Sequence, residues 1–172
     1  MSEEEKIVGE EAGCYTEHGV SGYGVAARLS REKPISEANL KKLAEDMMLL
    51  IVDKCMALGA RAIGHIKSFI RTEAGYIRAD SIGRPYGAHS SGTLSQPVTE
   101  IYLTVNSIVQ GIPEDKVKEA TLAGIHEEAE KEGLTVIKEK EHIYFDEFDT
   151  VIPEHEYARQ LEVQLSDTEE ES

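Results

Sequence analysis

Two histidines stand where an imidazole could act as a general base. His65 lies in the alternating run Gly64-His65-Ile66-Lys67, and His89 lies beside two serines in a stretch rich in Gly and Ser. Because histidine titrates near neutral pH, either one could serve an enzyme that acts on a phosphorylated or carboxylated metabolite. Both are candidate catalytic residues, although neither belongs to a motif that identifies a reaction.

Cationic and hydroxyl side chains near these histidines could bind an anion. Arg84 offers a guanidinium that can hold a phosphate or carboxylate with two hydrogen bonds, and Lys67 offers a point charge. The serines add hydroxyl donors, and the glycines around them allow a close approach of backbone amides. The sequence therefore predicts a site for a small anionic ligand, formed by Lys67, Arg78, Arg84, Ser90 and Ser91.

The segments 60–71 and 76–83 alternate in polarity and are joined by a short turn that contains Gly75, which predicts a β-hairpin. Hairpin pairing would place Asp80 opposite position 67. This favours an ion pair between Lys67 and Asp80 over a contact between His65 and Asp80 that would orient the imidazole.

One side of the predicted sheet gathers a large share of the basic residues, because side chains alternate between the two sides of a strand. Phe69, Tyr76 and Tyr102 are expected among them, with Ile63 on the same side. This face could bind an anionic ligand, contact a second subunit, bind single-stranded RNA or simply be solvated. The expected bases are Arg28, Arg61, His65, Lys67, Arg71, Arg78, Lys138 and Lys140.

These residues need a sheet to position them, and the rest of the chain predicts one. Apolar residues at three- and four-residue spacing predict a helix from Ser36 to Gly59 and a weaker one over 113–133. Strands are expected over 25–31, 98–110 and 134–145, and the polar stretch 80–97 is expected to be a loop. The fold class is α+β, a two-layer sandwich with two helices on one face of a mainly antiparallel sheet, ferredoxin-like with an extra strand.

Composition suggests one domain with two acidic flanks. The formal net charge is −15, yet the acids exceed the bases only before residue 19 and after residue 138. We expect a flexible segment over 1–18, a single α+β domain over 19–147 and a partly disordered segment over 148–172. No apolar run approaches the roughly 18 residues that cross a bilayer, so we expect a soluble cytoplasmic protein with no membrane contact.

Metal and cofactor sites are not expected. The six histidines show no ligand spacing, and the two cysteines are far apart: Cys55 fits the apolar stripe of the first helix, and Cys14 reads as a free thiol. The hypothesis is a homo-oligomeric binding or assembly protein that holds a small anionic ligand. The alternatives are the enzyme with a histidine base and, third, an RNA-binding module.

Overall fold

A computed structural model of the chain describes residues 19–142. Two helices, α2 (Glu37–Ala57) and α3 (Glu114–Lys131), alternate with strands, and a 3₁₀ turn, η1 (Arg84–Tyr86), lies between β3 and β4. The strands are β1 (Val20–Ile35), β2 (Ala62–Thr72), β3 (Gly75–Ser81), β4 (His89–Leu94), β5 (Val98–Gln110) and β6 (Thr135–His142).

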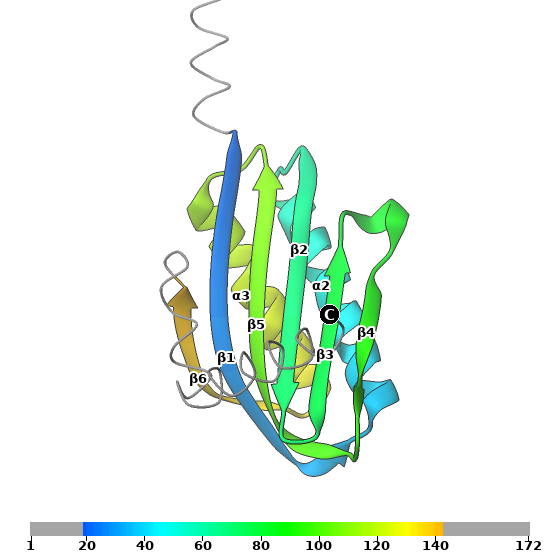
Figure 1. The fold of residues 1–172 in the computed structure, drawn as a ribbon. Helices are drawn as coiled ribbons and strands as arrows, with labels where there is room; N and C mark the ends of the chain where they lie inside the picture. The colour runs from blue at the N-terminus through cyan, green and yellow to red at the C-terminus, as the bar shows by residue number, and fades with distance from the viewer. Residues whose placement is uncertain (1–18, 143–172) are drawn as a thin grey trace, which may run out of the picture. The chain divides into compact units, whose positions relative to one another are not determined.

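The strands form one sheet in the order β4-β3-β2-β5-β1-β6. β5 pairs antiparallel with both β1 and β2, and the hairpin strand β3 pairs antiparallel with β2 and β4. Both helices lie on the same side of this sheet, behind it in Figure 1, so within residues 19–142 no helix covers the other side. The predicted fold class, an α+β sandwich of two layers, is confirmed.

The number of strands differs from the prediction by one. Without β3, η1 and β4, the order is strand-helix-strand-strand-helix-strand, the order of a ferredoxin-like arrangement. The segment between β2 and β5 contributes two strands to the edge of the sheet rather than one, because part of the expected loop is the strand β4.

The stretch 80–97 was predicted to be a loop, and this prediction is wrong for His89–Leu94. Glycines in both strands permit the pairing. A Cβ on Gly92 of β4 would lie 2.1 Å from the carbonyl oxygen of Tyr76, and a Cβ on Gly75 of β3 would lie 2.1 Å from that of Thr93. The Ser81 hydroxyl closes the intervening turn by donating to the carbonyl of Gly87 at 2.7 Å. Glycine and serine here permit a close pairing of β3 with β4, although the same residues are typical of loops.

Helix α2 begins and ends where the sequence predicts. The Ser36 hydroxyl accepts a hydrogen bond from the amide of Asn39, which satisfies one free donor of the first turn. Lys42 forms an ion pair with Asp46, and Lys41 forms one with Glu37 rather than with Glu45. The side chain of Glu45 is thereby available to another element.

The core lies between the helices and the sheet. Alternate residues of the strands pack against the apolar stripes of α2 and α3, and Cys55 is fully buried there, as predicted. Burial raises the pKa of the Cys55 thiol to about 11, so it is an unreactive core side chain. Within residues 19–142, neither helix combines the length and apolar character needed to cross a membrane.

The predictions for the flanks concern residues outside the described part of the chain. These are the segments 1–18 and 148–172, the thiol of Cys14 and the last residues of the strand expected over 134–145.

Candidate anion-binding face

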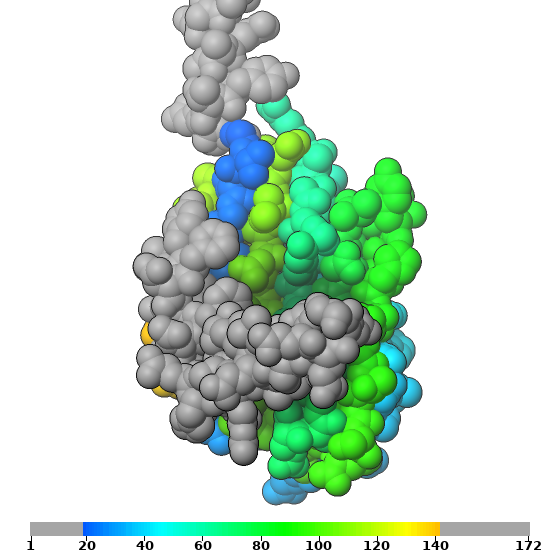
Figure 2. All heavy atoms as spheres, in the orientation of Figure 1, coloured from blue at the N-terminus to red at the C-terminus, as the bar shows by residue number. Residues whose placement is uncertain are grey.

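The side of the sheet opposite the helices, here called the open face, carries most of the predicted site residues. It is built by the outward residues of β1, β5, β2, β3 and β4, whose partners follow from the strand register. One row across the sheet consists of Arg28, Tyr102, Arg71, Tyr76 and Thr93, each paired with the next. The row beside it is Ala26, Thr104, Phe69, Arg78 and Ser91. Figure 2 views the molecule from this side, with β2 to β4 coloured cyan to green.

Arginines and aromatic rings alternate along this face. The guanidiniums of Arg28 and Arg71 lie 5.8 Å and 5.4 Å from the centre of the Tyr102 ring. Arg78 lies 5.2 Å from the ring of Tyr76 and 5.5 Å from that of Phe69. These are cation–π distances, so the rings hold the arginines in an extended arrangement across four strands. We call this arrangement the Arg–aromatic ladder.

A β-bulge in β2 corrects two of the predicted positions. The pairing of β2 with β5 shifts between Ile63 and His65, and a Cβ on Gly64 would lie 3.0 Å from the carbonyl oxygen of Ile108. Because the bulge adds one residue, Ile63 turns to the helix side and packs against the core. The alternation that placed Arg61 and Ile63 beside His65 is therefore broken, and the part of β2 on the open face begins at His65.

His65 and Asp80 are in contact. His65 Nε2 lies 2.9 Å from Asp80 Oδ2, and both side chains are partly exposed. Asp80 is paired in register with Lys67, as predicted, but its carboxylate reaches diagonally to the imidazole. The expected ion pair between Lys67 and Asp80 is therefore wrong: Asp80 contacts His65 instead, and Lys67 has no ion-pair partner among residues 19–142.

Arg84 and Ser90 do not join the open face. Arg84 forms an ion pair with Asp53 of α2, and the Ser90 hydroxyl donates to Glu45 Oε1 at 2.5 Å. Both contacts attach the β3–β4 hairpin to the outer surface of α2. The predicted site residues are therefore divided: His65, Lys67, Arg78, His89 and Ser91 share the open face, whereas Arg84 and Ser90 lie on the helix side.

The lysines of β6 lie at the edge of the open face. Glu139 and Glu141 reach His126 and Lys118 on α3, so these two acids point to the helix side. Alternation then places Lys138 and Lys140 on the opposite side, as the sequence predicted.

Glu100 balances one end of the ladder, and sequence reasoning assigned it no role. It accepts hydrogen bonds from Arg28 at 2.6 Å and from the Tyr102 hydroxyl at 2.7 Å. These bonds hold the pKa of the Glu100 carboxyl below its usual value, Arg28 having the larger effect, and the carboxylate raises the pKa of Tyr102. The sequence contains one indication of this contact: Glu100 and Tyr102 are two residues apart, so they lie on the same side of a strand.

Among residues 19–142, the open face therefore carries more positive than negative charge. Its acids, Glu100 and Asp80, are bonded to Arg28 and His65, while Lys67 and Arg78 contact no acid of residues 19–142 within ion-pair distance. This cationic surface belongs to a chain whose formal net charge is −15.

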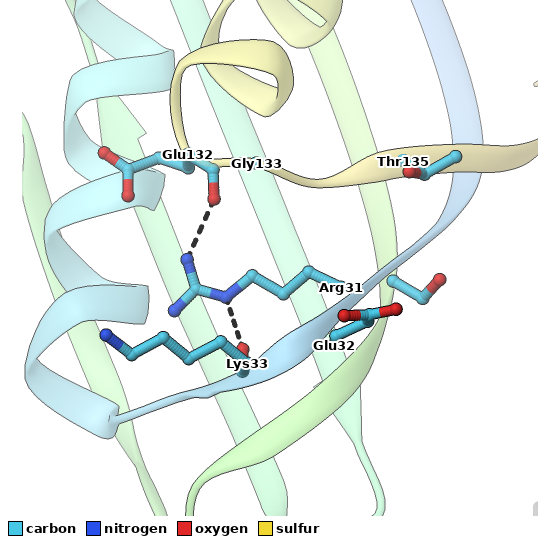
Figure 3. Close-up of a pocket in the computed structure, with 7 residues that line it drawn as sticks. Arg31, Glu32, Lys33, Glu132, Gly133 and Thr135 are labelled. Atoms are coloured by element: carbon cyan, nitrogen blue, oxygen red, sulfur yellow. Dashed lines mark hydrogen bonds between the residues drawn. The ribbon is translucent and has the colours of Figure 1, made fainter.

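The hollow in Figure 3 lies away from these residues, where the end of β1 meets the turn between α3 and β6. It encloses about 680 Å³. The guanidinium of Arg31 donates to the backbone carbonyls of Lys33, Pro34 and Glu132. Because Glu132 ends α3, this arginine caps the helix and joins it to β1. Arg31 therefore has a structural role, and the lining of the hollow includes none of the predicted site residues.

Residues that could hold a metal ion are not grouped in the described structure. Across residues 19–142, no cluster of three or more His, Cys, Asp or Glu side chains has a suitable arrangement.

Comparisons with known proteins give little similarity. No protein-family model matches the chain, and no curated protein does. Two solved structures align weakly: the Zn(II)-bound YjiA GTPase from E. coli, with a TM-score of 0.32, and a Zn(II)-bound triple mutant of YjiA GTPase, with a TM-score of 0.31. Each alignment has 14% sequence identity and covers 61% of this chain but only 29% of the other.

Proposed function

We propose that this chain is a binding protein whose open face holds an anionic ligand. The observation that carries the proposal is the Arg–aromatic ladder: Arg28, Arg71 and Arg78 are ordered by rings on the side of the sheet opposite α2 and α3. Lys67 and Ser91 lie in the adjoining positions and add a charge and a hydroxyl. The core unit of the fold is proposed to be ferredoxin-like, with the β3–β4 hairpin widening the sheet.

Ordered guanidiniums favour binding because less side-chain freedom is lost when the anion arrives. The rings that flank them limit their rotation before the ligand is present. Lys67 and Arg78, which have no acid beside them among residues 19–142, can exchange water for a ligand oxygen without breaking an ion pair there.

The test is titration calorimetry with inorganic tripolyphosphate at an ionic strength of about 0.1 M, where the Debye length is about 10 Å. The double variant Lys67→Gln, Arg78→Gln removes two positive charges from the open face. We expect its affinity to fall at least about tenfold, because each lost charge-assisted hydrogen bond contributes about 1.5–3 kcal/mol.

The matched control, Lys42→Gln with Lys116→Gln, removes the same charge from α2 and α3 on the other side of the sheet. It should bind within about twofold of the wild type, since exposed charges at that distance are screened. An equal loss in both double variants would contradict a site on the open face, as would absence of binding to the wild type.

The second candidate function is catalysis by His65, which the 2.9 Å contact with Asp80 favours. A carboxylate on one ring nitrogen can orient the imidazole so that the other nitrogen accepts a proton. A screen for hydrolysis of phosphate and carboxylate esters would detect this activity. Turnover that His65→Gln abolishes and His89→Gln preserves would support it, whereas turnover unchanged in both variants would exclude these histidines.

Cytoplasmic location and self-association remain predictions from the sequence. Ile63 packs against the core, so Phe69 lacks the apolar neighbour that was expected beside it in a subunit contact.

A further inference from the structure

The charged groups of the open face follow a line and do not converge on a point. Arg28, Tyr102, Arg71 and Tyr76 are successive partners on β1, β5, β2 and β3. Neighbouring strands are about 4.8 Å apart, so the residues Arg28 and Arg71, with a ring between them, are roughly 10 Å apart across the sheet. Arg78 continues the series from the adjoining row on β3.

A compact anion would use only part of this line. A site for a single phosphate or carboxylate needs donors that point at one position, usually in a concavity. The hollow of Figure 3 lies elsewhere, at Arg31 and Glu132, and its arginine is bonded to the backbone. A ligand with charges repeated along its length could contact every cation of the ladder together.

The rings indicate which kind of repeating anion fits. Tyr76 is 44% exposed, and Ile108 on the same face is 45% exposed, so the ladder combines charge with apolar surface. A polyphosphate or an acidic peptide of glutamates would leave this surface in water. A nucleic acid has a repeating phosphate and also a flat base at each step, which stacks on aromatic rings and on guanidinium planes.

We infer that the open face binds single-stranded nucleic acid, with the phosphates along Arg28, Lys67, Arg71 and Arg78 and the bases against Tyr76 and Phe69. This inference rests on the proposed function and specifies its ligand class. Single strands are required because the bases of a duplex are stacked on each other and cannot reach the rings. Recognition would be largely independent of base sequence, since stacking and backbone contacts carry little sequence information.

The experiment measures fluorescence anisotropy of labelled 12-nucleotide oligomers with the full chain. Probes are oligo-U RNA, oligo-dT DNA and a DNA duplex, and the competitors are polyglutamate and tripolyphosphate. We expect the single strands to bind at least about tenfold more tightly than the duplex. Tyr76→Leu should weaken single-strand binding about fivefold or more, since stacking contributes about 1–3 kcal/mol per base.

Tyr86→Leu is the matched control, because Tyr86 is also exposed but lies in η1, outside the ladder. It should bind like the wild type. Neither tyrosine is part of the buried core, and a thermal melt of each variant confirms folding.

The two proposals can fail separately. Tripolyphosphate binding that depends on Lys67 and Arg78, with duplex or polyglutamate competing as well as the single strands, would overturn the nucleic-acid inference and leave the anion-binding face intact. An equal effect of Tyr76→Leu and Tyr86→Leu would also overturn it. Absence of binding to every probe would overturn both.

Discussion

Glu128 is a carboxyl group that the fold buries on α3. Its residue is only 3% exposed, and its contact is the Nζ of Lys131 at 3.3 Å. Burial raises the pKa of Glu128, Lys131 partly opposes the rise, and the nearby acids Asp46 and Glu132 add to it. A buried carboxyl with a raised pKa binds its proton more tightly in the folded chain than in the unfolded one.

This residue should make stability fall as the pH rises. Between the unfolded pKa and the raised folded pKa, the native state binds more protons, so the free energy of unfolding decreases with pH across that window. Glu128→Gln mimics the protonated carboxyl. It should match the wild type near pH 4 and become the more stable protein by pH 7, as measured by urea unfolding at both pH values.

The exposed neighbour Glu130 provides the control for this prediction. Glu130→Gln removes a carboxylate from the same helix without altering the buried position. If the stability difference between Glu128→Gln and the wild type does not change with pH, burial of Glu128 has no part in the pH dependence.

At the scale of elements, the β3–β4 hairpin depends on Gly92. Its φ is +115°, a conformation that other residues rarely adopt, and its missing side chain leaves room for the backbone of β3. Gly92→Ala should separate β4 from β3 at a cost of about 1–3 kcal/mol or more, since the added methyl group would meet the carbonyl of Tyr76.

Hydrogen exchange measured by mass spectrometry can locate this effect. Peptides from β3 and β4 should lose protection, while those from β1 and β5 keep theirs, because edge elements open separately from the centre of a sheet. Gly87→Ala is the control: Gly87 also has a positive φ, of 71°, but no atom lies within 4 Å of a Cβ there. Equal exchange in the two variants would contradict the close-approach argument.

The sequence predicts the two helices and the long strands because each has a regular apolar period. The helix from Ser36 to Gly59 has a cap, a stripe and a stop, and the structure has all three. β4 has no such period: it is short, polar and lies at the edge, where one neighbour and the surface of α2 hold it. Its pairing depends on a glycine that accommodates another strand, which a single sequence presents only as a loop signal.

The positions of the site residues could be predicted as far as side chains alternate regularly along a strand, but not beyond the β-bulge in β2 that interrupts this alternation. Lys67, Arg78 and Ser91 share the open face, and Tyr102 lies there with Arg28 and Arg71. The bulge at Gly64 moved Ile63 to the other side of the sheet, and the acids of α2 bound Arg84 and Ser90. A bulge and a contact between distant elements are tertiary features that local spacing does not encode.

For the whole molecule, the distribution of charge predicts that folding and ligand binding respond differently to salt. The chain carries a net charge of −15, but residues 19–138 hold equal numbers of acidic and basic residues. Folding of this part meets little net self-repulsion, and its exposed ion pairs contribute little each. We therefore expect the melting temperature to change by no more than about 2 °C between 50 and 500 mM NaCl.

Binding should respond to salt in a different way. Each phosphate that a lysine or arginine neutralises releases counterions, and the logarithm of the affinity falls with the logarithm of salt concentration by about 0.7 per contact for a single strand. The acidic flanks oppose this attraction, and salt screens them too, so the slope of the wild type reports both effects together. Comparing the wild type with a variant that has the same flanks separates these two effects.

The difference in slope between the wild type and Arg78→Gln isolates one contact, because Arg78 contacts no acid of residues 19–142 within ion-pair distance. The flanks are identical in the two proteins, so their contribution cancels, and the slope should become shallower by about 0.7. Lys116→Gln, which removes one charge from α3, should leave the slope unchanged. If Arg78→Gln lowers the affinity equally at every salt concentration, Arg78 supports the positions of Phe69 and Tyr76 and does not contact a phosphate.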